Sequence, residues 1–163
     1  MEDYEYKKFD FDNPSFMFIV EDMLKNIIGG PLFYEPYFKT FGLKGDENVL
    51  DFGCGGGSIS KALLKFLSKG GNLTAIDVSG FWIKKARKRL EKYSNATFMA
   101  GDIRNLDIED NIFDVISIIH VIHDISPQER KDIVFALCKK LKQGGRIYIR
   151  EPIKKSHGMP ELK

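Results

Sequence analysis

From Asn48 onward, short apolar runs alternate with longer stretches in which apolar residues recur every three or four positions. The short runs predict buried strands and the longer stretches predict amphipathic helices. Strands are expected over Asn48–Phe52, Asn72–Asp77, Ala96–Gly101, Phe113–Ile119 and Arg146–Glu151. Helices are expected over Ser58–Lys69, Ser79–Tyr93 and Pro127–Lys142, with Gly144-Gly145 closing the last. This alternation favours a doubly wound α/β fold, a mostly parallel sheet with helices on both faces.

The first 44 residues do not follow this alternation. Eleven of the 20 aromatic residues lie in the first 41 positions. One helix face would gather six apolar residues: Phe16, Ile19, Val20, Met23, Leu24 and Ile27. Such a helix would either pack on the sheet edge or form a lid over a ligand. We therefore divide the chain into an aromatic-rich helical extension, residues 1–44, and a ligand-binding domain, residues 45–163.

The stretch "DFGCGGGS" marks a candidate binding loop between the first strand and the first helix of the domain. In a parallel sheet, ligands bind outside the carboxyl ends of the strands, where this loop lies. Gly53, Gly55 and Gly57 would let the main chain bend sharply and approach a ligand closely. Ser58 stands where the dinucleotide-binding pattern requires glycine or alanine, and the chain has no Gly-Lys pair for a phosphate-binding P-loop.

Several motifs in order resemble class I S-adenosylmethionine-dependent methyltransferases, from about Asn48 to Glu151. They are the D-x-G-x-G-x-G loop, the acid ending "TAIDVS", and the segments "AGDIRNL", "FDVISIIHVIHDI" and "LKQGGRIYIRE". The resemblance implies a Rossmann-like methyltransferase fold with strand order 3-2-1-4-5. It also implies S-adenosylmethionine as cofactor and S-adenosylhomocysteine as product.

The resemblance also implies a role for each strand end. Asp51 would attract the ammonium group of the cofactor, directly or through water, beside the glycine loop. Asp77 would accept hydrogen bonds from both ribose hydroxyls. The alternative for either residue is an ordinary acid at the end of a strand, facing water.

The resemblance also implies that the adenine end of the cofactor binds at the ends of the second and third strands. Asp102 would accept a hydrogen bond from the adenine amino group, and the Ile103 N–H would donate to a ring nitrogen. Val78 and Ile103 would form an apolar slot for the ring, and Ile119 would add to the cofactor site. Asp102 could instead be only a turn residue.

His120 and His123 are the candidate catalytic residues, because they follow the fourth strand where the transferred methyl group is expected. Either could act as a base or orient the acceptor, since histidine titrates near neutral pH. The alternative is that both only pack and form hydrogen bonds. A metal site is not expected, because no third ligand accompanies the two histidines. Methyl transfer needs no catalytic triad, and the sequence shows none.

Composition and charge indicate which kinds of binding partner and which compartment to expect. The chain has 163 residues, 43% hydrophobic and 29% charged, with a formal net charge of +2. These values point neither to nucleic acid nor to a membrane. The basic residues of the 79–93 helix are interpreted as an exposed charged face. Two cysteines without a C-x-x-C pair suit a reducing cytoplasm, so we predict a cytoplasmic protein.

The family's sheet usually has seven strands and ends in an antiparallel hairpin, whereas only a dozen residues follow the fifth predicted strand. That segment is polar and contains two prolines, so the final hairpin is expected to be missing. We expect the domain to be C-terminally truncated; the alternatives are a natural minimal form and an exposed edge that another chain covers. A dimer through this edge is one expectation.

The sequence therefore predicts a methyltransferase that acts on a small-molecule acceptor. The alternatives are an RNA or protein methyltransferase, a non-catalytic S-adenosylmethionine-binding module, and a nicotinamide-dependent dehydrogenase. Ser58 and the absence of a usable Tyr-x-x-x-Lys motif stand against the dehydrogenase.

Overall fold

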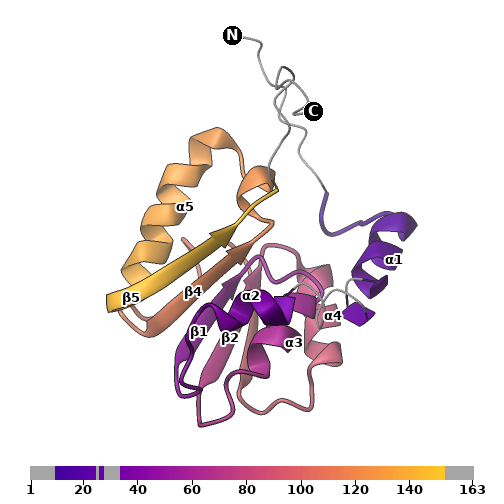
Figure 1. Cartoon of the computed structure of the whole chain (residues 1–163). Helices are drawn as coiled ribbons and strands as arrows, with labels where there is room; N and C mark the ends of the chain where they lie inside the picture. Colours follow the sequence, from indigo (N-terminus) through magenta and orange to yellow (C-terminus); the bar gives the residue numbers. More distant parts are fainter. Residues whose placement is uncertain (1–9, 25, 28–33, 153–163) are drawn as a thin grey trace, which may run out of the picture.

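A computed structural model describes residues 10–24, 26–27 and 34–152 of the chain. Its centre is one parallel sheet of five strands, β1 (Asn48–Phe52), β2 (Asn72–Asp77), β3 (Ala96–Ala100), β4 (Phe113–Ile119) and β5 (Leu141–Arg150). The strand order is β3-β2-β1-β4-β5 (Figure 1). The predicted order 3-2-1-4-5 is thus confirmed. The order reverses between β1 and β4, so the crevice for a ligand lies at their carboxyl ends.

Helices cover both faces of the sheet, as the doubly wound fold requires (Figure 1). On one face, α2 (Glu35–Lys39), α3 (Ser58–Leu64) and α4 (Gly80–Arg89) contribute to a core with β1 residue Val49. On the other face, α5 (Pro127–Lys140) packs Ile133 and Leu137 against Leu50. Alternate residues of β1 therefore enter opposite cores, as the two-residue period of a strand dictates.

The boundary between α5 and β5 differs from the prediction. The helix ends at Lys140 and the strand begins at Leu141, so Gly144-Gly145 lies inside β5 and does not close the helix. The register between β4 and β5 shifts between Phe113 and Val115, where the pairing of the two strands is irregular. Gly144 has φ +79°, and a Cβ on Gly145 would lie 2.7 Å from Leu141 Cγ. The glycines thus allow a bulge in β5, which the sequence does not distinguish from a helix end.

The N-terminal extension has two different parts. Tyr34, Phe38 and Phe41 are buried in the core beside α3, so this part is integral to the domain. In contrast, α1 (Phe16–Leu24) has no buried residue, and Phe16 is 77% exposed. Packing on the sheet edge was one of the two arrangements expected, but most of the apolar face is exposed instead.

The outer edge of β5 has no neighbouring strand within the part of the chain that the structure describes. Among these same residues, no helix is both long and apolar enough to cross a membrane. A 3₁₀ helix, η2 (Ile122–Asp124), follows β4 and completes the elements around the crevice.

Candidate active site

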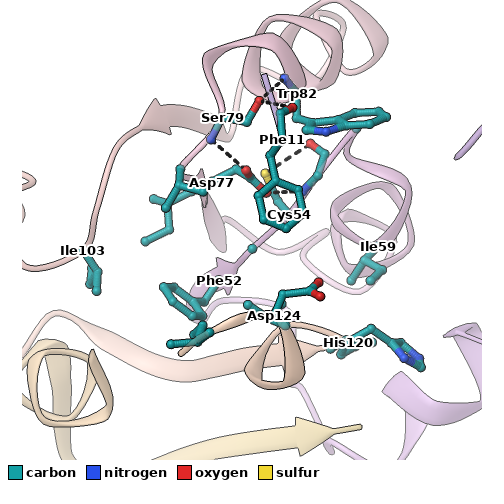
Figure 2. A pocket seen from close by; sticks show the side chains of 18 of the residues that line it. Phe11, Phe52, Cys54, Ile59, Asp77, Ser79, Trp82, Ile103, His120 and Asp124 are labelled. Atoms are coloured by element: carbon teal, nitrogen blue, oxygen red, sulfur yellow. Dashed lines mark hydrogen bonds between the residues drawn. The ribbon is translucent and has the colours of Figure 1, made fainter. Parts of the chain in front are cut away.

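A cavity of about 810 Å³ lies at the carboxyl ends of β1, β2 and β4, under the N-terminal segment (Figure 2). Eight predicted site residues line it: Gly53, Gly55, Asp77, Val78, Asp102, Ile103, Ile119 and His120. Asp51, Gly57 and His123 are not among the described lining residues. The lining carries eight carboxylates: Asp10, Asp12, Glu21, Asp22, Asp77, Asp102, Asp124 and Glu129.

The three glycines of the predicted loop serve different purposes. Gly53 has φ +73°, and a Cβ there would lie 2.4 Å from Val121 Cγ2, so this glycine lets two loops touch. Gly55 has φ +50° and open space where its side chain would be. Gly57 caps α3 with φ +80° and packs against Ala86. Gly55 is therefore the glycine at which bare main chain faces the cavity.

Asp77 joins the glycine loop to the start of α4. Its Oδ2 accepts a hydrogen bond from Gly55 N at 2.9 Å, and its Oδ1 accepts one from Ser79 N at 2.9 Å. Burial raises the pKa of Asp77, and the two backbone donors offset part of that rise. Each oxygen keeps further acceptor capacity toward the cavity.

Asp51 faces the sheet–helix core rather than the cavity. Its side chain is 1% exposed, and its Oδ2 accepts a hydrogen bond from Ser60 Oγ of α3 at 2.6 Å. Burial raises its pKa to about 7, Ser60 opposes the rise, and the charge of Asp77 adds to it. The strand alternation explains the placement, because Asp51 shares a face of β1 with Val49.

The adenine-side residues gather at the ends of β2 and β3. Val78 is 61% exposed while Ile103 is 2% exposed, and both line the cavity. Asp102 is held by Arg104, whose Nε lies 2.9 Å from Asp102 Oδ1, and this hydrogen bond lowers the pKa of Asp102. Arg104 also pairs with Glu129 of α5 at 2.9 Å. Sequence analysis missed Arg104 and Glu129, although Arg104 follows Asp102 by only two positions.

The two histidines differ in placement. His120 lines the cavity, has φ +57°, and its backbone N–H donates to Arg150 O at 2.8 Å. His123 Nδ1 lies 2.6 Å from Glu151 Oε2. Burial opposes ionisation of Glu151, but hydrogen bonds from His123 and from two backbone N–H groups of the η2 segment outweigh it and lower its pKa. His123 therefore belongs to a contact that fixes the loop after β4.

Residues of the N-terminal segment complete the cavity, and sequence analysis did not identify them individually. Ser79, the N-cap of α4, contacts this segment through its hydroxyl, which lies 2.9 Å from Phe11 O and 2.8 Å from Asp12 Oδ1. Figure 2 shows the Phe11 ring directed into the cavity. Phe18 of α1 packs edge-to-face on Trp82, with ring centroids 5.9 Å apart. Aromatic rings of this segment and of α4 thus form one wall of the cavity.

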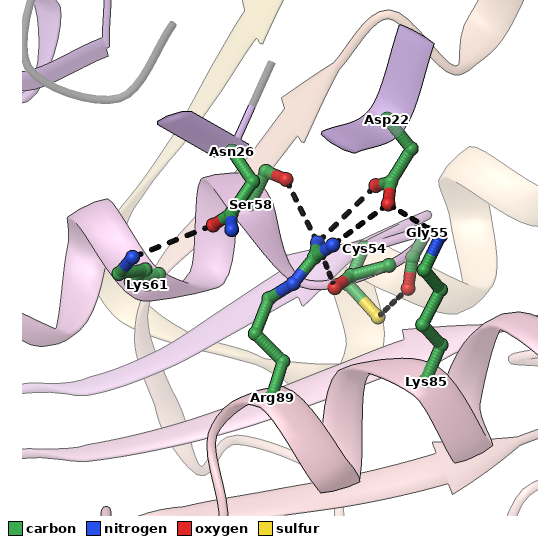
Figure 3. A network of polar contacts seen from close by, with 9 residues as sticks. Asp22, Asn26, Cys54, Gly55, Ser58, Lys61, Lys85 and Arg89 are labelled. Atoms are coloured by element: carbon green, nitrogen blue, oxygen red, sulfur yellow. Dashed lines mark hydrogen bonds and ion pairs between the residues drawn. The ribbon is translucent and has the colours of Figure 1, made fainter. Parts of the chain in front are cut away.

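An ion-pair network fastens α1 to this loop (Figure 3). Asp22 Oδ2 lies 2.8 Å from both Arg89 NH2 and Lys85 Nζ of α4. Arg89 NH1 also donates to Gly56 O at 2.5 Å. A Cβ on Gly56 would lie 2.5 Å from Asp22 Oδ1, so Gly56 leaves room for this carboxylate. In the described part of the chain, no group of three or more His, Cys, Asp or Glu side chains could hold a metal ion.

Comparison with known proteins decides the family. Residues 49–145 match the model of the methyltransferase domain, more than half of the chain. The chain belongs to the class I S-adenosylmethionine-dependent methyltransferases. The cofactor of this family is S-adenosylmethionine. The sequence-based assignment of family and fold is thereby confirmed.

The methyltransferase domain has curated relatives of distinct activities. It is 26% identical to a ubiquinone/menaquinone biosynthesis C-methyltransferase of Azotobacter vinelandii over 146 residues, covering 85% of this chain and 56% of that protein. It is 28% identical to a carboxy-S-adenosyl-L-methionine synthase of Helicobacter pylori, covering 90% of this chain and 63% of that protein. The domain thus spans about 60% of the length of these relatives.

A solved structure shares the fold of the methyltransferase domain. This is an S-adenosylmethionine-dependent methyltransferase from Aquifex aeolicus, with a TM-score of 0.69 and 23% identity. The match covers 94% of this chain and 79% of that one. The five strands and their flanking helices therefore follow the family's architecture.

Proposed function

We propose that this domain transfers a methyl group from S-adenosylmethionine to a small-molecule acceptor, and that it acts in the cytoplasm. The observation that carries the proposal is the open main chain of Gly55, held 2.9 Å from Asp77 at the edge of a large cavity. Free cysteines, Cys54 and Cys138, agree with a reducing compartment. The names of the relatives, which concern small metabolites, support the acceptor class.

The residues of the cavity fit the cofactor of the family. In this proposal the methionine part lies along the main chain of Gly53 and Gly55, and the open space at Gly55 leaves room for it. Asp77 accepts from the ribose hydroxyls with the acceptor capacity that its backbone donors leave free. Val78 and Ile103 present apolar surface to the adenine ring, and Asp102 stands beside them.

Asp51 has an indirect role in this proposal. Its buried carboxyl is held by Ser60 and does not line the cavity, so it would support the shape of the loop from below. Gly57 likewise supports the loop by allowing α3 and α4 to pack closely. Both residues would thus affect cofactor affinity by positioning the residues that touch the cofactor.

The chemistry places few demands on the protein. When bound, S-adenosylmethionine supplies a methyl group on a positively charged sulfur, which an acceptor atom can displace. The cavity residues must therefore hold the acceptor in line with that methyl group and exclude water. Phe11, Phe18 and Trp82 provide the apolar cover. His120 lines the cavity and is the histidine placed to orient the acceptor or take its proton.

Among the competing functions, an RNA methyltransferase finds less support in the geometry. An RNA methyltransferase would bring phosphates to a cavity whose described lining residues include eight carboxylates and one arginine, and this charge opposes the binding of RNA. A protein methyltransferase or a non-catalytic binding module would use the same cofactor residues, so acceptor screening separates them from the proposed function.

Removal of the ribose acid tests the proposal. Asp77→Ala should weaken the binding of S-adenosylhomocysteine by about 1–3 kcal/mol, because a charged acceptor of two hydrogen bonds is lost. Titration calorimetry on the full chain measures this change. His123→Ala is the matched control and should leave the affinity unchanged, since His123 does not line the cavity. Equal affinity in the Asp77 variant and the unaltered protein would refute the ribose assignment.

A further inference from the structure

The apolar face of α1 points away from the domain. Five apolar side chains of this helix and the residue three positions after it are each at least 51% exposed: Phe16, Met17, Met23, Leu24 and Ile27. Helical spacing places them on one side of α1. None of these five side chains is among the residues that line the cavity. They therefore form an apolar surface that is separate from the site described above.

The charged face of α1 points inward. All four acidic residues of segment 10–27 line the cavity: Asp10, Asp12, Glu21 and Asp22. Asp22 is the one that forms ion pairs with Lys85 and Arg89 (Figure 3). A surface helix of a globular protein normally buries its apolar side and exposes its charged side. Because α1 does the opposite, its apolar side is left to a partner outside the domain.

The neighbouring helix α4 adds positive charge beside this surface. Its ten residues include no acid and five basic side chains: Lys84, Lys85, Arg87, Lys88 and Arg89. Lys84 and Lys88 are exposed and lie one turn apart on the outer side of the helix. The chain as a whole has a net charge of only +2, so this helix is a local concentration of positive charge.

Aromatic contacts join the two helices into one surface. Phe18 of α1 and Phe81 of α4 both pack edge-to-face on Trp82, with ring centroids 5.9 and 5.2 Å away. Phe81 is 38% exposed and lies on the same side of α4 as Lys84 and Lys88. The exposed apolar side of α1 therefore adjoins a strip of α4 that carries an aromatic ring and two free-standing lysine stems. Figure 1 shows α1 at the periphery of the molecule beside α4.

This combination matches the surface of a bilayer that contains anionic phospholipids. A helix with one apolar side lies in the plane of such a surface, and neighbouring lysines are attracted to the lipid phosphates. This mode of binding requires no membrane-spanning helix. A second copy of the chain is a poorer match, because a two-fold interface would bring the same basic surface onto itself.

We propose that α1 and α4 form a docking surface for an anionic phospholipid bilayer. The apolar side of α1 enters the boundary between headgroups and acyl chains, and Lys84 and Lys88 lie at the phosphates. The inference goes beyond the proposed function, because none of these side chains is assigned to the cofactor or the acceptor. Since the inner side of α1 lines the cavity, docking would bring the cavity close to the membrane surface.

Flotation of the full chain with lipid vesicles tests the proposal. Vesicles of phosphatidylcholine alone are compared with vesicles that contain about one third phosphatidylglycerol, in about 0.1 M salt. We expect the chain to bind the anionic vesicles about 10-fold or more tightly than the neutral ones. Absence of binding to the anionic vesicles, or equal binding to both kinds, would overturn the proposal.

Variants of the outer side of α1 test the apolar contribution. Phe16→Ser combined with Leu24→Ser should weaken binding to the anionic vesicles about 10- to 100-fold, because two apolar side chains no longer enter the lipid. Phe135→Ser is the matched control, since it removes a side chain that is 63% exposed on α5, across the sheet. It should leave vesicle binding unchanged. Equal losses in the α1 and α5 variants would contradict a specific role for α1.

Variants of α4 test the contribution of charge. Lys84→Gln combined with Lys88→Gln should weaken binding to the anionic vesicles about 10-fold. Lys131→Gln combined with Lys139→Gln is the control, because it removes the same charge from two exposed positions of α5. An equal effect of the two pairs would mean that overall charge and not the α4 surface attracts the lipid, which overturns the proposal. Circular dichroism melting verifies that each variant is folded.

Two further measurements separate this inference from the alternatives. If sedimentation without vesicles shows self-association that the Phe16 and Leu24 changes abolish, the α1 surface joins two copies of the chain and the lipid proposal fails. Calorimetry with S-adenosylhomocysteine tests the proposed function independently, and the α1 variant should keep the affinity of the unaltered chain because neither changed side chain lines the cavity. Vesicle binding and cofactor binding can thus fail separately.

Discussion

At the scale of single residues, the alternation of side chains along a strand decides which acidic residue lines the cavity. Asp51 and Asp77 both lie near the carboxyl ends of strands, yet only Asp77 lines the cavity. Asp51 is one residue before the end of β1 and points into the core with Val49, where Ser60 holds it. Burial without a cation beside it raises the pKa of Asp51 to about 7. This carboxyl couples the stability of the domain to pH.

We expect the free energy of unfolding to decrease as the pH rises from about 4 to about 7. The folded state keeps a proton on Asp51 up to about pH 7, whereas the unfolded chain releases it near 3.8. Asp77, whose pKa is also raised, adds a contribution of the same sign. Asp51→Asn should remove its share, on the order of 4 kcal/mol for a difference of about three pKa units. Denaturant unfolding at pH 4 and pH 8 measures the free energy of unfolding of the unaltered protein and of the Asp51→Asn variant. An equal pH dependence in these two proteins would contradict the prediction.

At the scale of elements, the site depends on close contact between the loops after β1 and β4. Gly53 N donates to Ile76 O at 2.9 Å, which fixes the first loop to β2. Glu151 Oε1 accepts from Val121 N at 2.9 Å, which fixes the second loop to the end of β5. The two loops then meet where Val121 fills the space that a side chain on Gly53 would take. Four strands thus cooperate in holding the floor of the cavity.

Gly53→Ala should destabilise the fold by about 1–3 kcal/mol, because its Cβ would overlap Val121. Gly55→Ala is the matched control, since Gly55 also has positive φ but open space around it. Gly55→Ala should destabilise the fold less, because only backbone strain contributes. Adding Val121→Ala to the Gly53 variant should recover part of the loss. Chemical denaturation of the four proteins measures these differences, and equal effects at the two glycines would exclude the overlap.

At the scale of the whole molecule, the N-terminal segment is both a part of the core and a cover of the site. Phe38 and Phe41 are fully buried beside α3, whereas α1 is held by Asp22 through its ion pairs with α4. Burial opposes ionisation of Asp22, but Arg89 and Lys85 outweigh it and lower its pKa. The attachment is therefore complete above the ordinary carboxyl pKa and is lost as the pH falls below it.

Asp22→Asn should loosen α1 without unfolding the sheet. We expect amide hydrogen exchange in α1 to become about 10- to 100-fold faster at neutral pH, because a charged contact of about 1–3 kcal/mol is lost. Exchange in β1 and β4 is the internal control and should not change. Mass spectrometry of peptides from both regions reports the rates. Unchanged exchange in α1 would mean that apolar contacts such as Phe18 on Trp82 hold it instead.

Dimerisation through the edge of β5 and the division of the chain at residue 44 remain predictions. The strand order leaves β5 at the edge, and Ile149 is 54% exposed there. Sedimentation at increasing protein concentration would measure self-association.

The sequence by itself determined the alternation of strands and helices, the glycine loop, the strand order through its family resemblance, and the acids at the strand ends. These features are local, because the period of apolar residues and the turn chemistry act over a few positions. Asp77 could therefore be placed at the cavity from the strand pattern, and Val78 and Ile103 from the family resemblance.

Only the tertiary structure decided which of these residues lie at the cavity and which other residues they contact. Asp124, Arg104 and Asp12 became lining residues because loops distant in sequence converge at one end of the sheet. The outward apolar face of α1 likewise follows from three-dimensional packing. The sequence does not encode these outcomes in any short pattern, since they depend on contacts between distant segments, such as Asp22 with Arg89, 67 positions apart.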